Sequence, residues 1–281
     1  MNRRRLLTTS AAGLAYFRLS PMCPAAENSL YAARVLAKKP CGYWRLGDKT
    51  GSRVADVSGK GHDGSLHGTV TLNDKGVLAH ETNGAMKFDG KGSYVEIPNS
   101  PDFSQPTSGV GFSVEAWMRP DVLEFTGENE DNYIHWLGKG EAGKQEWGFR
   151  FYPKKSSRPN RISAYIFSPG PGLGSGAYVE EPVAAGKWIH IVATFDPGDK
   201  TKPKAGVSIF KNGKLVGSAA HSPGQLYKTY DIMPVHGSAP LRLGTRDAKT
   251  FFTGALDEVA IYPRVLSAGE VADNYRAAKA G

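Results

Sequence analysis

Residues 145–152 read Gln-Glu-Trp-Gly-Phe-Arg-Phe-Tyr, and the alternation in this stretch decides the fold class. Successive side chains of a strand point to opposite faces. One face would carry Trp147, Phe149 and Phe151. The other would carry Glu146, Arg150 and Tyr152. One apolar and one wet face are typical of an antiparallel sheet that packs on a core with one side only.

Short runs rich in β-branched and aromatic residues, most of them bounded by Gly, Pro, Asn or Asp, occur on both sides of this stretch. The predicted strands are 42–46, 85–88, 94–97, 112–118, 133–137, 147–152, 161–167, 188–195, 207–210, 214–217, 241–243 and 255–262. The turn Asn212-Gly213 predicts a hairpin, because a type I′ turn needs positive φ. Strands do not alternate with helices, which argues against a parallel α/β sheet.

Two helices are predicted, one before the first strand and one after the last. Residues 29–37 form the first. Ser267 and Glu270 have the spacing of a capping box and open the second. Val271, Tyr275 and Ala278 then share one face of that helix. We expect both helices to brace the outside of the strands.

Several stretches in one order resemble the laminin-G-like jelly-roll domains of the concanavalin A-like lectin/glucanase superfamily. They are YWRLGD (43–48), DVSGKGHDG (56–64), MKFDG (86–90), FSVEAWMRP (112–120), WIHIVATFD (188–196), FKNGKLV (210–216), and GALDEVAIY (254–262) with RVLS (264–267) and Glu270. The resemblance implies an all-β fold over residues 40–281: a two-sheet antiparallel jelly-roll sandwich with a short C-terminal helix. We expect Trp117 and Trp188 to be buried in it.

Residues 1–26 have the pattern of an export signal. Arg3, Arg4 and Arg5 precede a short apolar run, and small residues follow near position 25. The consecutive arginines beside Leu6 resemble a twin-arginine signal. The alternative is a disordered or membrane-tethering N-terminus. We predict an exported protein (periplasmic, cell-surface or secreted), with residues 27–39 as a helix and linker before the sandwich.

The charge of the chain is ordinary once this segment is set aside. The chain has 35 basic and 27 acidic residues. Residues 1–26 contain four arginines and no acid, which leaves 31 against 27 and a net charge of +4. We therefore predict no nucleic-acid partner. After the first twenty residues no stretch is apolar for long enough to span a bilayer, so no transmembrane segment is predicted after signal removal.

Catalytic motifs are not evident. Glycoside hydrolysis needs two carboxylates ~5–9.5 Å apart, and hydrolases of this superfamily often place them as Glu-x-Asp-x-Glu, which this chain lacks. Glu115 shares its strand face with uncharged neighbours, and the adjacent Asp257 and Glu258 are expected on opposite faces. His135 and His190 are expected to be structural. We predict no enzyme activity, with a pair of carboxylates from distant strands as the open alternative.

A calcium ion is predicted from the resemblance, since related sandwiches often hold one that fixes loops. Calcium takes six to eight oxygen ligands. Asp56 and Asp63, in a glycine-rich loop, and Asp257, in the last strand, are the predicted metal ligands. The alternative is that Asp56 and Asp63 make only Asx turns and Asp257 binds loop amides.

A ligand-binding patch is predicted on two strands. If 147–152 and 161–167 are neighbours, the side chains away from the core form one exposed patch, bordered by a loop at 169–178. The predicted binding residues are Arg150, Tyr152, Arg161 and Tyr165. The alternative is that they are only the solvated side of the two strands.

Three functions remain open at this point. The first is a non-catalytic binding module for a glycan or an extracellular protein, and it is the one we predict. The second is a glycoside hydrolase. The third is a structural accessory domain without a ligand. The fold by itself does not choose among them.

Overall fold

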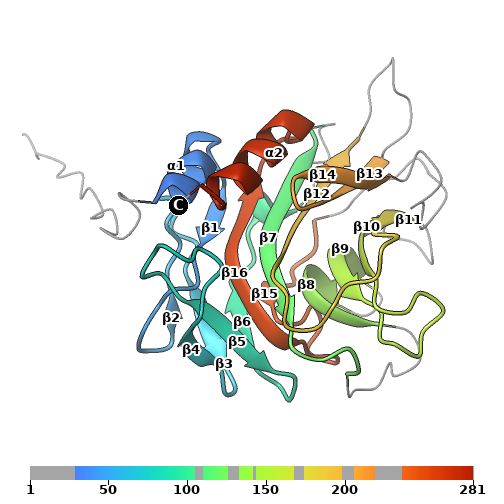
Figure 1. Cartoon of the computed structure of the whole chain (residues 1–281), viewed down its shortest axis with the longest axis horizontal. Helices are drawn as coiled ribbons and strands as arrows, with labels where there is room; N and C mark the ends of the chain where they lie inside the picture. Colours follow the sequence, from blue (N-terminus) through green and yellow to red (C-terminus); the bar gives the residue numbers. More distant parts are fainter. Residues whose placement is uncertain are drawn as a thin grey trace, which may run out of the picture.

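The computed structural model of the chain describes residues 29–104, 110–125, 133–141, 144–167, 174–197, 206–218 and 236–280. These residues form two eight-stranded sheets, antiparallel throughout, and two α-helices (Figure 1). The predicted jelly-roll sandwich with a short C-terminal helix is thus confirmed. The predicted export signal, residues 1–26, lies outside the described residues.

The first sheet has the strand order β14-β13-β12-β7-β16-β5-β4, with β1 paired to β16. Its strands are β1 (Gly42–Trp44), β4 (Thr71–Asp74), β5 (Ala85–Asp89), β7 (Phe112–Pro120), β12 (Ile189–Asp196), β13 (Gly206–Lys211), β14 (Lys214–Ser218) and β16 (Thr253–Tyr262). The helices α1 (Leu30–Ala37) and α2 (Ala268–Ala277) pack on its outer face.

The second sheet has the order β11-β10-β9-β8-β15-β6-β3-β2. Its strands are β2 (Arg53–Val54), β3 (Gly64–His67), β6 (Tyr94–Ile97), β8 (Ile134–Glu141), β9 (Lys144–Phe151), β10 (Ile162–Phe167), β11 (Gly174–Tyr178) and β15 (Leu241–Leu243). A short 3-10 helix (Pro101–Phe103) lies between β6 and β7. The predicted bordering loop 169–178 is in part a strand, since Gly174–Tyr178 forms the edge strand β11.

The main core lies between the two sheets, and a second apolar layer lies between the first sheet and the helices. Trp147, Phe149 and Phe151 enter the main core, as their alternation predicts. Trp117 is fully buried in the helix layer, as expected. Trp188, also expected to be buried, is only half-buried, because it precedes β12. The Arg119 guanidinium covers its ring at 5.2 Å.

Local signals in the sequence set the helix ends and the hairpin. Ser267 and Glu270 form the predicted capping box at α2. Ser29 caps α1 by accepting from the Ala32 amide. The β13–β14 turn has positive φ at Asn212 (52°) and Gly213 (78°), as a type I′ turn requires. No helix among the described residues is both long and apolar enough to cross a bilayer.

Candidate functional site

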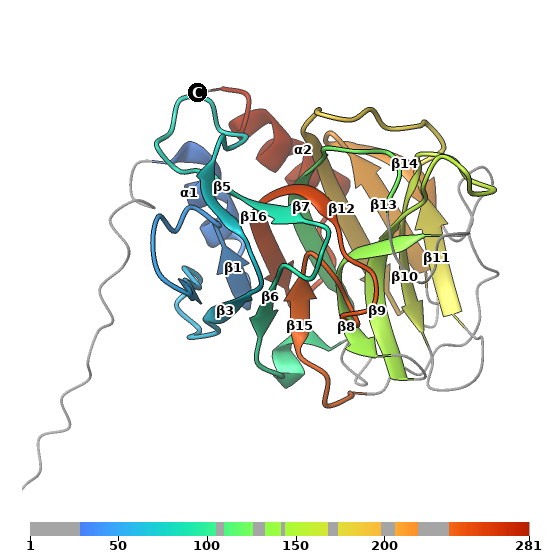
Figure 2. The ribbon, with the colours of Figure 1, turned by 90° about the horizontal axis from the view of Figure 1, so that it is seen from below.

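The outer face of the second sheet is the face turned away from the main core, and neither α-helix covers it (Figure 2). It carries a group of polar, charged and aromatic side chains. One row of residues crosses five strands in register: Tyr165, Gly148, Gly138, Arg242 and Glu96. Except for Lys139, which pairs with Glu146, the residues on either side of this row along each strand lie in the main core. The row is therefore one line across the outer face.

The two glycines in this row, Gly148 and Gly138, leave a strip of backbone without side chains of its own, here called the lane. Side chains from elsewhere lie on it. A Cβ at Gly148 would lie 3.1 Å from the Tyr165 hydroxyl oxygen, and a Cβ at Gly138 would lie 3.1 Å from Arg246 Cγ. Glycine inside a strand often marks such a close approach. Tyr165 and Arg246 thus lie flat against the backbone of β8 and β9.

Four side chains form a nearly closed polar ring over this lane. Arg246 donates to the Tyr165 hydroxyl through Nη1 and to Asp247 Oδ2 through Nη2, at 2.7 Å. The Tyr165 hydroxyl lies 2.7 Å from His135 Nε2. If the phenol proton is donated to His135 Nε2, the imidazole proton lies on Nδ1. That nitrogen lies 4.0 Å from Asp247 Oδ2.

The ring keeps His135 neutral. Burial lowers the pKa of His135 well below its usual value, and the charges of Arg246 and Arg150 lower it further. Burial also raises the pKa of Tyr165, against the two arginine charges that lower it. The neutral imidazole and the neutral phenol are bonded to one another in this ring, and both are buried in fixed orientations.

Arg150 lies between two tyrosine rings. Its guanidinium carbon is 4.0 Å from the ring centroids of Tyr133 and of Tyr165, which is close enough for a strong cation–π contact. The condition set for the predicted patch is met, because β9 and β10 are adjacent strands that pair directly. The predicted proximity of Arg150 and Tyr165 follows from that pairing.

The predicted exposure of this patch is wrong. Tyr165 is 0% exposed, Tyr152 4% and Arg150 6%, while Arg161 is half-buried. Glu146, also expected on a wet face, is 4% exposed because it accepts from Lys139, Ser104 and the Gly237 amide. Strand alternation places a side chain on a face but does not show what packs over that face. Ligand binding by the four predicted residues stays a prediction.

Half-buried aromatic rings flank the same face. His67 and Tyr94, opposite one another on β3 and β6, stack with centroids 4.6 Å apart and an angle of 5°. Phe251 lies 6.3 Å from Tyr94. Phe251 follows the turn 245–250, which also carries Arg246 and Asp247. One turn therefore positions both the polar ring and the aromatic group.

Comparison with known proteins agrees with this architecture. The family model of the concanavalin A-like lectin/glucanases superfamily, a laminin-G-type model, matches residues 89–272. The chain belongs to this superfamily. No curated protein sequence matches it.

Solved structures similar to this superfamily member show the fold. Domain 4 of AbnA, a GH43 extracellular arabinanase from Geobacillus stearothermophilus in complex with arabinotriose, is 18% identical, with a TM-score of 0.58 over 84% of this chain and 98% of that one. The binding domain of Paraclostridial Mosquitocidal Protein 1 is 13% identical (TM-score 0.62, 85% of this chain). That of Botulinum neurotoxin DC in complex with SialylT is 13% identical (TM-score 0.59, 86% of this chain). The chain spans about half, 52%, of each toxin domain.

The three predicted calcium ligands do not form one group, although Asp56 and Asp63 lie in the same loop. Asp56 accepts from the amides of Tyr43, Ser58 and His62, and Asp63 accepts from the Asp56 amide and pairs with Arg53. Asp257 accepts from the Val77 amide. In the described part of the chain, no three His, Cys, Asp or Glu side chains form a metal-binding group. Calcium binding stays a prediction.

The calcium prediction has a direct test. A bound ion stabilises the folded state by mass action, about 2.7 kcal/mol at a hundred times its Kd. If Asp56 holds an ion, replacing millimolar calcium by a chelator lowers the melting temperature, and Asp56→Ala removes this difference. Equal melting of the wild type in both solutions would contradict a calcium site.

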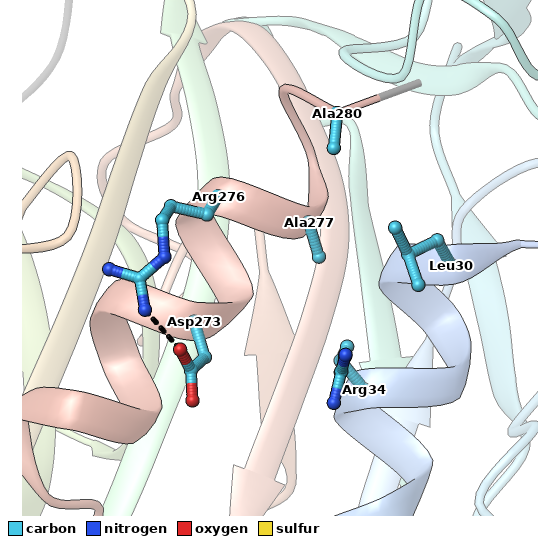
Figure 3. Close-up of a pocket in the computed structure, with 6 residues that line it drawn as sticks. All are labelled: Leu30, Arg34, Asp273, Arg276, Ala277 and Ala280. Carbon is cyan, nitrogen blue, oxygen red and sulfur yellow. Dashed lines mark hydrogen bonds and ion pairs between the residues drawn. The ribbon is translucent and has the colours of Figure 1, made fainter.

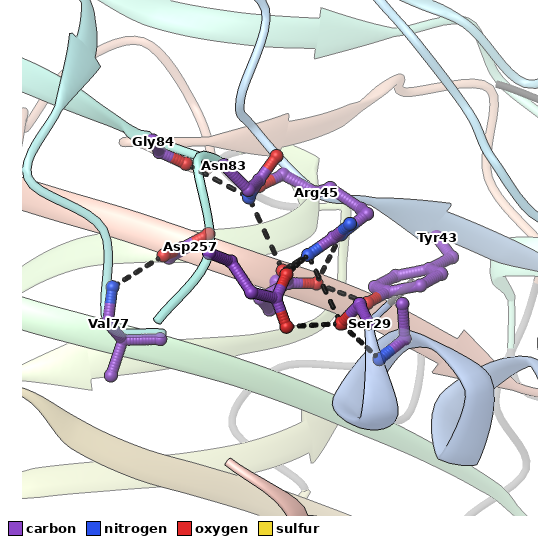
Figure 4. Close-up of polar contacts among 10 residues, drawn as sticks. Ser29, Tyr43, Arg45, Val77, Asn83, Gly84 and Asp257 are labelled. Carbon is purple, nitrogen blue, oxygen red and sulfur yellow. Dashed lines mark hydrogen bonds and ion pairs between the residues drawn. The ribbon is translucent and has the colours of Figure 1, made fainter. Parts of the chain in front are cut away.

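The buried carboxylates of β16 are unsuited to catalysis. A register shift between Asp257 and Ala260, with positive φ at Glu258, places both carboxyl groups in one polar layer and not on opposite faces as predicted. Both residues are 0% exposed. Glu258 is held by Arg45 and by the Tyr43 hydroxyl (Figure 4). A substrate has no access to these groups, and the layer is structural.

A cavity lies between α1 and α2. Its volume is about 420 Å³, and Figure 3 shows the residues that line it: Leu30, Arg34, Asp273, Arg276, Ala277 and Ala280. Asp273 already pairs with Arg276, one turn along the same helix. The cavity lies on the helices, away from the second sheet.

Sequence reasoning missed several residues of the site. Arg246, Asp247, Tyr94 and Phe251 belong to no pattern that marks them in the sequence, whereas His135, predicted to be structural, is 1% exposed and bonded to Tyr165. The available signal was the pair of glycines, Gly138 and Gly148, inside two strands otherwise rich in large residues. It does not reveal which distant side chains fill the lane.

Proposed function

We propose that the protein is a non-catalytic module that works outside the cytoplasm and binds a carbohydrate on the outer face of its second sheet. The observation that carries this is the helix-free face itself, with a buried polar ring flanked by half-buried aromatic rings. The similar solved structures support it, since they include an arabinotriose complex, a SialylT complex and binding domains.

The geometry suits a sugar. Aromatic faces pack against the C–H surfaces of pyranose or furanose rings, and a few fixed polar groups orient the hydroxyls. Tyr94 and Tyr133 are half-buried and offer such faces. Arg150, Tyr152 and Tyr165 are largely buried and hold the surface rigid. Arg161 lies directly before β10.

The acidic groups of this face favour binding over hydrolysis. Each of its central carboxylates is held by a cation: Glu96 by Arg242 at 2.9 Å, Glu146 by Lys139 at 2.5 Å and Asp247 by Arg246 at 2.7 Å. A glycosidase acid must instead be free to deliver a proton to the leaving oxygen. We expect purified protein to release no reducing ends from the polysaccharides it binds.

Removing the two half-buried rings is expected to weaken carbohydrate binding. In Tyr94→Ala/Tyr133→Ala, affinity should fall by about tenfold, since each ring contact contributes about 0.5–1.5 kcal/mol. Affinity electrophoresis in gels containing arabinan, alginate or heparin measures the loss. The matched control is Leu215→Ala, which removes a 56%-exposed side chain from β14 of the other sheet.

Unchanged retardation of the folded double variant would contradict a site on this face. Binding to none of the polysaccharides would contradict the proposed function. Location is tested separately: mass spectrometry of protein from the cell envelope or medium should find residues 1 to about 26 missing. A mature chain that starts at Met1 would count against export.

A further inference from the structure

The connection between β9 and β10 is strongly basic. It reads Tyr-Pro-Lys-Lys-Ser-Ser-Arg-Pro-Asn-Arg over residues 152–161, with four cations and no acid. It leaves the sheet directly beside Arg150 and returns at Ile162, so it lies at one end of the candidate carbohydrate face. We call residues 152–161 the basic loop.

Three of its four cations have no ion pair with a described residue. Lys154 and Lys155 are exposed and Arg158 is half-buried. Within the described ranges, none of the three side chains has a carboxylate within ion-pair distance. Arg161 differs, because its Nε donates to the Glu180 carbonyl at 2.6 Å and its Nη2 lies 3.8 Å from the Glu180 carboxylate.

The loop also presents Arg158 in a fixed position. The Arg158 guanidinium carbon lies 5.5 Å from the Tyr178 ring centroid and 5.8 Å from that of Tyr152. Contact with two rings restrains a long side chain that would otherwise lose freedom when it binds. A planar guanidinium in this position suits a carboxylate or sulfate group.

Backbone hydrogen bonds hold the loop in one conformation. The Tyr152 amide donates to Arg161 O and the Asn160 amide to Tyr152 O, both at 2.9 Å. The Lys154 amide donates to Leu123 O at 3.1 Å, and the Val183 amide donates to Asn160 O at 2.8 Å. The cations are thus displayed on a closed loop that is tied to two neighbouring segments.

We infer that the ligand is an acidic polysaccharide, whose sulfate or carboxylate groups contact Lys154, Lys155 and Arg158 while its sugar rings lie on the second sheet. This rests on the proposed function and names its ligand class. Charge complementarity carries it, since cations without an ion pair among the described residues, one of them restrained by two rings, attract polyanions more strongly than neutral glycans.

The test uses the full chain in affinity electrophoresis with heparin (sulfate and carboxylate), alginate (carboxylate only) and arabinan (neutral). We expect binding to the two acidic polymers to exceed binding to arabinan and to weaken steeply with added sodium chloride. Lys154→Gln/Lys155→Gln/Arg158→Gln should lose about tenfold in affinity for the acidic polymers, since exposed pairs contribute about 0.2–1 kcal/mol each. Its affinity for arabinan should not change.

The matched control is Lys49→Gln/Lys75→Gln/Arg34→Gln, which removes the same charge from exposed residues elsewhere. An equal loss in this control, or no loss in the basic-loop variant, would overturn the inference. So would equally tight binding to duplex DNA, which would indicate unspecific attraction to polyanions. Binding to arabinan that depends on Tyr94 and Tyr133, without preference for acidic polymers, would overturn the inference and leave the proposed function standing.

Discussion

Glu115→Ala is expected to lower the free energy of unfolding by about 3–5 kcal/mol, because it leaves buried donors without their acceptor. Glu115 is 0% exposed and lies on β7, beneath both helices. Its carboxylate contacts four groups at 2.6–2.8 Å: the Tyr31 hydroxyl, His190 Nε2, the Tyr262 hydroxyl and Asn274 Nδ2. Tyr31 belongs to α1 and Asn274 to α2, so one carboxylate fixes both helices to the first sheet.

Thermal unfolding measures this loss, with an expected fall in Tm of roughly 6–20 °C. Hydrogen exchange should locate the increased opening in α1 and α2. The control is Glu124→Ala, at an exposed glutamate without a hydrogen-bonded partner among the described residues. A Tm within a degree of wild type would contradict the anchoring role of Glu115.

The stabilisation by Glu115 should depend on pH. Burial raises its pKa, but hydrogen bonds from His190, Tyr262 and Tyr31 and the His190 charge outweigh burial, so the pKa lies below the ordinary 4.5. A group with a lowered folded-state pKa stabilises fully above its unfolded pKa and loses this effect as the pH falls through the folded value. The gap in stability between wild type and Glu115→Ala should therefore narrow as the pH falls below about 4.5. A gap that widens on acidification would contradict this.

Arg45→Met is expected to cost about 3–5 kcal/mol at neutral pH, because it leaves the Glu258 charge buried without its cation. Arg45 Nη2 lies 2.7 Å from Glu258 Oε1 and 2.5 Å from Glu81 Oε2. Arg45 is 4% exposed and Glu258 is 0% exposed. These ion pairs join the residue that follows β1 to β16 and to the segment that precedes β5.

The sign of the pH effect is opposite to that for Glu115. Burial raises the pKa of Glu258, and Arg45 opposes that rise. Without Arg45 the folded-state pKa rises further, and a group with a raised pKa destabilises progressively as the pH rises from its unfolded pKa to its folded one. The loss in Arg45→Met should thus be larger at pH 8 than at pH 5.

Urea unfolding of single and double variants tests this pair. Arg45→Met/Glu258→Gln should recover part of the stability lost in Arg45→Met, because no charge is then left unpaired. The matched control is Arg53→Met. Its pair with Asp63 has a similar distance, 2.6 Å, but the Arg53 side chain is 69% exposed, so the loss should stay below about 1 kcal/mol. Equal losses in Arg45→Met and Arg53→Met would show that burial does not govern the Arg45 pair.

Tertiary structure decided where the site lies. The alternation of the two stretches implies a common face for Arg150 and Tyr165 only if β9 and β10 pair, and the structure supplies this pairing. The polar ring is not implied by the sequence, because His135, Arg246 and Asp247 approach only when β15 and the turn 245–250 lie against β8. That contact joins segments more than 100 residues apart, and no local pattern specifies it.

The sequence by itself determined the elements and their order. Alternation, the Asn212-Gly213 turn and the Ser267–Glu270 capping box depend on contacts within a few residues, so they can be recognised in the chain. Which polar residues are buried was decided only by tertiary structure. Arg150, Glu115 and Glu258 are charged residues of the kind usually found at the surface. In the structure, helices, aromatic rings and opposite charges from distant segments enclose them. Burial depends on what packs over a face, whereas the alternation of a strand specifies only the face.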